Sequence, residues 1–266
     1  MKHYRSIMFT SLLLGFIISG CSHDSMQEQQ EVNKNMNEAS SHSHEMDKQH
    51  QTETKSHSQS SQQKKKDSVT VVSNPTSTDV LVNKYFALPE EYDPKDLVYP
   101  DVPFIFNEKI EKRMMRKEAA QALKHLVEGA KQDGIYIAGV SAYRSYQTQK
   151  ALFEAYVRKD GLEKAKMYSA FPGTSEHETG LAIDVSSSTG KCAAQDCFAG
   201  TPEANWLAEH ADDYGFIIRY PKGKEAITGY QYEPWHLRYV GTKASQEIAA
   251  KGITLEEYLD EVPVSQ

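Results

Sequence analysis

The chain has 266 residues, a formal net charge of −7 and only three cysteines. Its negative charge lies beyond residue 66, where 22 Lys and Arg stand against 30 Asp and Glu, and no basic patch stands out that could neutralise phosphates. These features argue against nucleic acid as a partner, and the length of residues 78–266 suits one domain with one core.

The N-terminus has the pattern of a lipoprotein export signal. Residues 1–20 combine a short positive start with an apolar run that is too short to span a membrane. The run ends at Ser19-Gly20-Cys21, which resembles a bacterial lipobox, whose Cys is acylated and becomes the first residue of the mature chain. We therefore predict a lipid on Cys21; an ordinary signal peptide with an incidental Cys is the alternative.

Residues 21–77 are predicted to be a disordered polar tether. They are rich in Ser, Gln, Glu, Lys, Asn and His and lack aromatic residues, so burial cannot offset the entropy of ordering them. A flexible coil of this length has an end-to-end distance on the order of 40 Å. Its five histidines could buffer zinc, but their irregular spacing favours a low-complexity tract. They are His23, His42, His44, His50 and His57.

The next part of the chain is predicted to be an extended arm followed by helices and a strand. Residues 79–106 contain several prolines and aromatic residues and are expected to lie over the domain. Apolar residues at helical spacing predict the longest helix over 107–132, which Gly134 ends. A strand over 135–140 and a second helix over 147–159 follow.

The first group of polar side chains lies in the segment 175–184, Ser-Glu-His-Glu-Thr-Gly-Leu-Ala-Ile-Asp. On a helix, His177 and Asp184 would be about 10 Å apart in rise, too far to share one metal ion through bonds of about 2 Å. The segment is therefore predicted to be non-helical. Gly180 permits a turn, and residues 181–185 alternate as a strand that presents Asp184 on its polar face, with His177 folding back toward it.

Cys192 and Cys197 follow this strand and are predicted to form a disulfide. In an exported protein they would close a small loop. A pair of metal ligands is the less favoured alternative, because there is no second thiol pair and the spacing is uncommon for structural zinc. Two free thiols are the third alternative.

The C-terminal third alternates helices and strands. Thr201 as a cap and a proline in the first turn predict a helix over 202–214. Strands over 216–220 and 235–240 and short helices over 243–251 and 254–261 follow. With the two earlier strands, they predict an α+β domain that has a small, mainly antiparallel sheet with helices packed on one face.

The second group of polar side chains is Glu233-Pro234-Trp235-His236. Pro234 disfavours an interior helical turn, so Glu233 and His236 are not the helical pair of an H-E-x-x-H site. Together with His177 and Asp184 they supply the groups that a catalytic zinc site needs: three ligands, a position open to water and a Glu that can accept the proton of the water.

The histidines at 125 and 210 are interpreted as solvent-facing helix residues.

These two motifs, S-x-H-x-x-G-x-A-x-D and E-x-W-H, resemble the VanY-type D-alanyl-D-alanine carboxypeptidases and the related L,D-carboxypeptidases. These are zinc enzymes that trim peptidoglycan stem peptides. Residues 81–84 and 141–149 also look like that family, so the resemblance covers roughly residues 79–262. It implies the fold shared by DD-peptidases and hedgehog domains.

The resemblance also implies roles for individual residues. It makes His177, Asp184 and His236 the ligands of one zinc ion per domain and Glu233 the catalytic base. It implies that the substrate pocket is lined by Arg144, Gln149, Ser175 and Tyr230. Arg144 suits a free C-terminal carboxylate or a tetrahedral oxyanion, because a guanidinium stays charged and donates paired hydrogen bonds.

These expectations describe a monomeric zinc carboxypeptidase, lipid-anchored to the outer face of a bacterial cell membrane, that removes the C-terminal D-alanine of peptidoglycan stem peptides. The spacing of residues does not decide between D,D- and L,D-specificity. Two other classes remain open. One is an inactive zinc-containing module that binds the wall, against which the retention of Glu233 argues. The other is an extracytoplasmic metal-handling lipoprotein that uses the His-rich tether.

Overall fold

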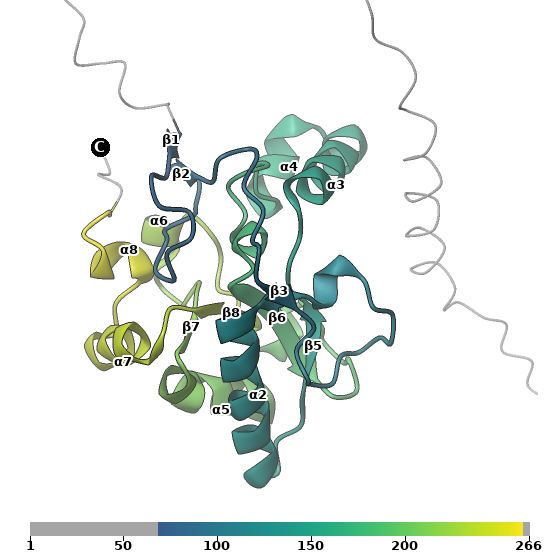
Figure 1. Cartoon of the computed structure of the whole chain (residues 1–266), viewed down its shortest axis with the longest axis vertical. Coiled ribbons are helices and arrows are strands. Elements are labelled where there is room, and N and C mark those ends of the chain that lie inside the picture. Colours follow the sequence, from purple (N-terminus) through teal and green to yellow (C-terminus); the bar gives the residue numbers. More distant parts are fainter. Residues whose placement is uncertain (1–68, 263–266) are drawn as a thin grey trace, which may run out of the picture. The chain divides into compact units, whose positions relative to one another are not determined.

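An antiparallel sheet forms the centre of the computed structural model, which describes residues 69–262 (Figure 1). Its strands follow the order β5-β6-β8-β7. They span Ile137–Ser141 (β5), Ala182–Ser187 (β6), His236–Tyr239 (β8) and Phe216–Ile218 (β7). All three pairings are antiparallel, which confirms the predicted sheet.

The apolar face of this sheet packs against helices α2 (Lys117–Gln132) and α5 (Pro202–His210). Thr201 caps α5 by accepting a hydrogen bond from the amide of Ala204 at 3.2 Å, and Pro202 occupies its first turn, as expected. The main core joins residues of both helices to those of the sheet: Leu123, Leu126, Leu207, Ile183, Val185, Phe216 and Leu237. The predicted α+β domain is confirmed.

The other helices lie around the edges of the sheet. Helices α3 (Tyr146–Asp160) and α4 (Leu162–Tyr168) form a hairpin at the end of the domain away from α2 and α5 (Figure 1). Helices α7 (Thr242–Lys251) and α8 (Leu255–Tyr258) build a second small core with Ile217 of β7. Shorter helical segments are α6 (Glu225–Thr228) and the 3-10 turns η3 (Asp196–Phe198) and η4 (Ala211–Tyr214).

The N-terminal arm lies on the domain, as predicted. Strand β1 (Thr70–Val71) pairs with β2 (Phe86–Ala87), and β3 (Leu97–Val98) pairs with β4 (Met115–Arg116). Between β1 and β2 the side chains of residues 80–82 are buried. Because β1 already pairs with the arm, residues 69–77 belong to the domain, although the sequence suggests a tether that runs to residue 77.

The long helix predicted over 107–132 is wrong in its first third. Only α2 is helical throughout, and residues 111–113 form a 3-10 turn, η1 (Glu111–Arg113). The carbonyls of Lys112 and Met114 accept hydrogen bonds from the amides of Ala142 and Tyr143 at 2.7 and 2.9 Å. These contacts between distant segments hold residues 112–116 out of a helix, against their local preference.

The predicted export signal, the predicted lipid on Cys21 and most of the predicted tether fall outside the described residues. Within residues 69–262 no helix has the length and apolar character needed to cross a membrane.

Candidate active site

The strand register brings Asp184 of β6 and His236 of β8 together. The two residues lie directly opposite each other in the pairing of these strands, so their side chains point to the same face of the sheet. Nδ1 of His236 lies 2.9 Å from Oδ1 of Asp184. Their neighbours along the two strands, Ile183 and Leu237, point to the opposite face and enter the core.

His177 reaches the same point from a tight turn, η2 (Glu176–Thr179). The segment was expected to be non-helical, but one 3-10 turn forms there and ends at Gly180, whose φ of +69° only glycine adopts without strain. Nδ1 of His177 lies 2.7 Å from the carbonyl oxygen of Ala142 and donates to it. Its Nε2 therefore faces Oδ2 of Asp184, at 3.4 Å.

The three side chains fit a zinc ion. One atom of each, from His177, Asp184 and His236, lies within 4.8 Å of the other two, and all three residues are buried. Bonds of about 2 Å in a tetrahedral arrangement would place ligand atoms roughly 3.4 Å apart, so only small movements are needed to hold the ion. Two imidazoles and one carboxylate are a donor set typical of catalytic zinc.

The charges of these groups depend on one another. Burial opposes ionisation of Asp184, yet the neighbouring imidazoles hold the pKa of its carboxyl well below its usual range. Burial lowers the pKa of His177. Burial also acts against a charged His236, but the neighbouring carboxylates of Asp184 and Glu176 raise its pKa to about 10. A metal ion that binds Nδ1 of His236 must therefore displace a proton.

Glu233 lies beside the three clustered side chains rather than among them. Its carboxylate is 4.0 Å from Nδ1 of His236 and is 28% exposed. A turn with Pro234 sets this spacing, because the amide of His236 donates to the carbonyl of Glu233 at 3.1 Å. Burial raises the pKa of Glu233 to about 7.

The predicted pocket residues occupy different depths. Arg144 is half-buried and donates from Nη1 to Oε1 of Gln149 at 2.7 Å. Gln149 itself is only 1% exposed, so it supports Arg144 from behind and does not face the solvent. Ser175 is buried at the start of η2. Tyr230 lies farther out: its ring packs on Tyr220, and the ring of Tyr220 packs on His236.

Sequence reasoning gave no role to two side chains that contact His236. The ring of Tyr220 lies 5.0 Å from the imidazole, and the carboxylate of Glu176 lies 3.5 Å from Nε2. Glu176 stands inside the first motif, immediately before the proposed ligand His177. This position is the one sequence feature that could have indicated a role for it. Tyr220 carries no signal in the sequence, because it belongs to no motif and reaches the site through the end of β7.

The cysteines that follow β6 are joined: the structure contains a disulfide between Cys192 and Cys197. It closes a short loop in the segment after β6, and the next residue in the chain, Phe198, is buried. Neither cysteine contributes to the group at Asp184.

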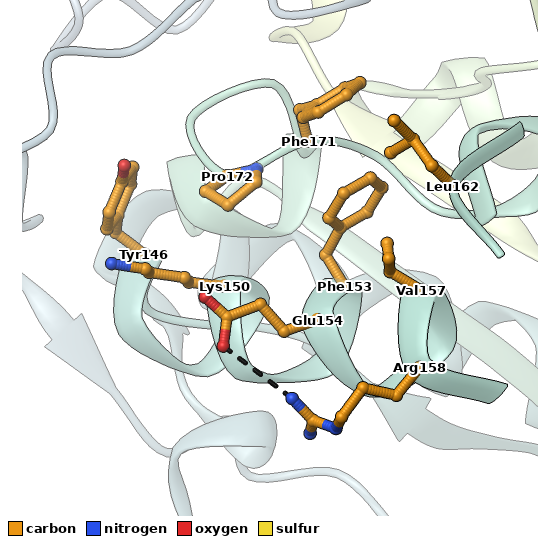
Figure 2. Close-up of a pocket in the computed structure, with 9 residues that line it drawn as sticks. All are labelled: Tyr146, Lys150, Phe153, Glu154, Val157, Arg158, Leu162, Phe171 and Pro172. Atoms are coloured by element: carbon orange, nitrogen blue, oxygen red, sulfur yellow. Dashed lines mark ion pairs between the residues drawn. The ribbon is translucent and has the colours of Figure 1, made fainter. Parts of the chain in front are cut away.

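A cavity of about 460 Å³ lies on the α3 and α4 hairpin, between α3 and the loop at Phe171 (Figure 2). Phe153 and Phe171 form its apolar wall, and Glu154 and Arg158 form an ion pair at 3.9 Å beside it. None of the residues that line this cavity belongs to the proposed metal site. The cavity is therefore separate from the chemistry described above.

Comparisons with known proteins identify the family. The family model described as VanY, D-alanyl-D-alanine carboxypeptidase, matches residues 112–242. A putative carboxypeptidase of Bacillus subtilis (strain 168), YodJ, is 52% identical over 196 residues, which cover 74% of this chain and 72% of the relative.

Two solved structures are also similar. The LdcB LD-carboxypeptidase, whose structure was described as revealing the molecular basis of peptidoglycan recognition, is 52% identical with a TM-score of 0.71; the match covers 75% of this chain and 94% of LdcB. A mutant of the vancomycin resistance D,D-pentapeptidase VanY, solved in complex with Zn(II), is 32% identical with a TM-score of 0.56; the match covers 68% of this chain and 98% of VanY. The chain therefore belongs to the VanY-type family of D-alanyl-D-alanine carboxypeptidases.

Proposed function

We propose that this protein is a zinc-dependent carboxypeptidase that removes the C-terminal D-alanine from peptidoglycan stem peptides, with D,D- or L,D-specificity. The observation that carries the proposal is the buried group of His177, Asp184 and His236 with the partly exposed carboxylate of Glu233 beside it. A purely structural zinc site is closed by four protein ligands and has no need of a nearby base. Relatives named as carboxypeptidases support the same activity.

In this reaction each site residue has its own role. His177, Asp184 and His236 would hold the zinc ion, which when bound would lower the pKa of a water molecule and polarise the carbonyl of the scissile bond. Glu233 is placed to accept the proton of the attacking water and to return it to the departing amine. Arg144, held by Gln149, offers a guanidinium for the free carboxylate of the substrate, and Ser175 and Tyr230 complete the pocket.

We also propose where the enzyme acts. The apolar run and lipobox at Cys21 support a lipid anchor on the outer face of the cell membrane, with the predicted tether between the anchor and the domain. Peptidoglycan lies on that side. Within the described residues there is one group of His and Asp side chains that could hold a metal, which supports one zinc ion per domain. Every residue of this site comes from the same chain, so a monomer can be active.

The test is to incubate the purified chain with synthetic tetrapeptide and pentapeptide stems and to identify the products by mass spectrometry. We expect wild type to release a single alanine, and Glu233→Gln to reduce kcat by about 10²- to 10⁴-fold, because the amide cannot accept a proton. Glu225→Gln, an exposed change on α6, is the matched control. Absence of alanine release by the zinc-loaded wild type, or equal release by wild type and Glu233→Gln, would contradict the proposal.

A further inference from the structure

Glu176 connects the proposed metal site to two buried arginines. Its side chain is fully buried, and its Oε1 accepts hydrogen bonds from Nε of Arg219 at 2.7 Å and from Nη1 of Arg238 at 2.6 Å. Both arginines are themselves fully buried. The carboxylate therefore cannot rotate freely, and its second oxygen points in one fixed direction.

That second oxygen faces His236. Oε2 of Glu176 lies 3.5 Å from Nε2 of His236. Among the described residues neither atom has a hydrogen-bond partner, although both are buried. A buried donor and a buried acceptor that face each other at this distance need only a small shift to form a hydrogen bond.

We propose that Glu176 is a positioning residue that keeps a proton on Nε2 of His236, so that Nδ1 is the nitrogen that gives up its proton and binds the metal. The inference rests on the proposed zinc site. It agrees with the orientation of the ring, because Nδ1 faces Asp184 and Nε2 faces Glu176. A histidine that binds a metal through one nitrogen is commonly held by a carboxylate on its other nitrogen, which fixes the tautomer.

The arginines make the carboxylate specifically necessary. Arg219 and Arg238 donate to Oε1, so that position requires an oxygen atom. In Glu176→Gln the amide oxygen would take that place, and the NH2 group would face Nε2 of His236. Two donors cannot point at each other, so Nε2 becomes the acceptor and the proton moves to Nδ1, the nitrogen that the metal needs.

The main experiment measures zinc affinity of the full chain by competition with a chelator. Glu176→Gln should bind zinc about 10- to 100-fold more weakly than wild type. Glu256→Gln is the matched control, because Glu256 accepts from Arg219 and Asn83 in the same buried network but does not contact His236. It should weaken zinc binding much less than Glu176→Gln does, even if the protein becomes less stable.

A second measurement needs no variant that might fail to fold. Long-range ¹H–¹⁵N spectra of the zinc-loaded wild type should show the His236 proton on Nε2 and the metal on Nδ1. Zinc on Nε2, or equal zinc affinity for Glu176→Gln and wild type, would overturn the role of Glu176 while the carboxypeptidase proposal stands. A wild-type chain that binds no zinc at all would overturn both.

Discussion

At the scale of single residues, Arg144 depends on a neighbour that solvent does not reach. Gln149 accepts from Nη1 of Arg144 and donates from Nε2 to the carbonyl of Ala170, both at 2.7 Å. One buried amide thus ties the guanidinium to the loop that leads into the first motif. A guanidinium fixed in this way loses less conformational entropy when it pairs with a carboxylate.

Gln149→Leu, which keeps the approximate size of the side chain, should therefore weaken substrate use without abolishing it. Loss of one hydrogen bond to a charged group is worth about 1.5–3 kcal/mol, so kcat/KM should fall by at most roughly 10- to 150-fold. We expect most of this decrease to come from a higher KM, measured with the stem peptide that wild type cleaves best. Gln147→Leu, an exposed change on the same helix, is the control. Unchanged kinetics for Gln149→Leu would show that Arg144 needs no support.

Residue types and spacing were sufficient to single out His177, Asp184, His236 and Glu233, because each belongs to a short motif whose chemistry is specific. They were insufficient for Glu176, whose place opposite Nε2 of His236 depends on two arginines more than 40 residues away in the chain. The carbonyl of Ala142 could not be predicted either, since a backbone acceptor leaves no trace in residue identity.

At the scale of elements, the step from η2 to β6 determines where His177 lies relative to Asp184. Gly180 makes this step with a φ of +69°. A Cβ atom at this position would lie 3.0 Å from the side chains of both Arg116 and Leu97. The arm and β4 therefore close over the turn, and glycine is required there both for the backbone conformation and for the close approach.

Gly180→Ala should lower the free energy of unfolding by about 2–5 kcal/mol, because left-handed strain of roughly 1–2 kcal/mol adds to overpacking of roughly 1–3 kcal/mol. Gly134→Ala is the matched control: its φ is +79°, but no atom lies within 4 Å of the added Cβ, so only the strain remains. Urea unfolding measures both. If both variants lose the same free energy of unfolding, the close packing over Gly180 does not contribute to the effect.

Elements were predicted well where a local signal was sufficient. Helix α5 has its cap and proline, and α2 has apolar residues at helical spacing. The prediction of a helix over 107–116 rests on Ile110 and Met114, which continue the helical spacing of the apolar residues in α2. Hydrogen bonds to residues 142 and 143, and the pairing of Met115 with Val98, oppose a helix there, and such contacts cannot be read from local sequence.

At the scale of the whole domain, a buried polar network joins the arm, the sheet and the C-terminal helix to the proposed metal site. Glu256 of α8 accepts from Asn83 of the arm and from Arg219. Arg238 of β8 donates to the carbonyls of Thr78 and Val80 at 3.0 and 2.7 Å. The proposed ligands thus rest on segments far apart in the chain, and a metal that binds them stabilises the fold as a unit.

Zinc should consequently raise the melting temperature of the protein. At a free zinc concentration 100-fold above Kd, binding to the folded state alone adds about 2.7 kcal/mol, which corresponds to roughly 5–11 °C for a domain of this size. Removal of zinc with a chelator should reverse the shift, and His177→Ala or Asp184→Ala should abolish it. His125→Ala, an exposed change on α2, should retain it.

The same measurement separates the enzyme from a metal-handling lipoprotein. Zinc that binds the histidines of the predicted tether binds the folded and the unfolded chain alike, so it adds nothing to the free energy of unfolding. Zinc that binds His177, Asp184 and His236 requires the fold, because β6, β8 and η2 must meet to form the site. A full-length chain that binds zinc with no change in melting temperature, and still does so after His177→Ala, would therefore place the metal on the tether and contradict the catalytic site.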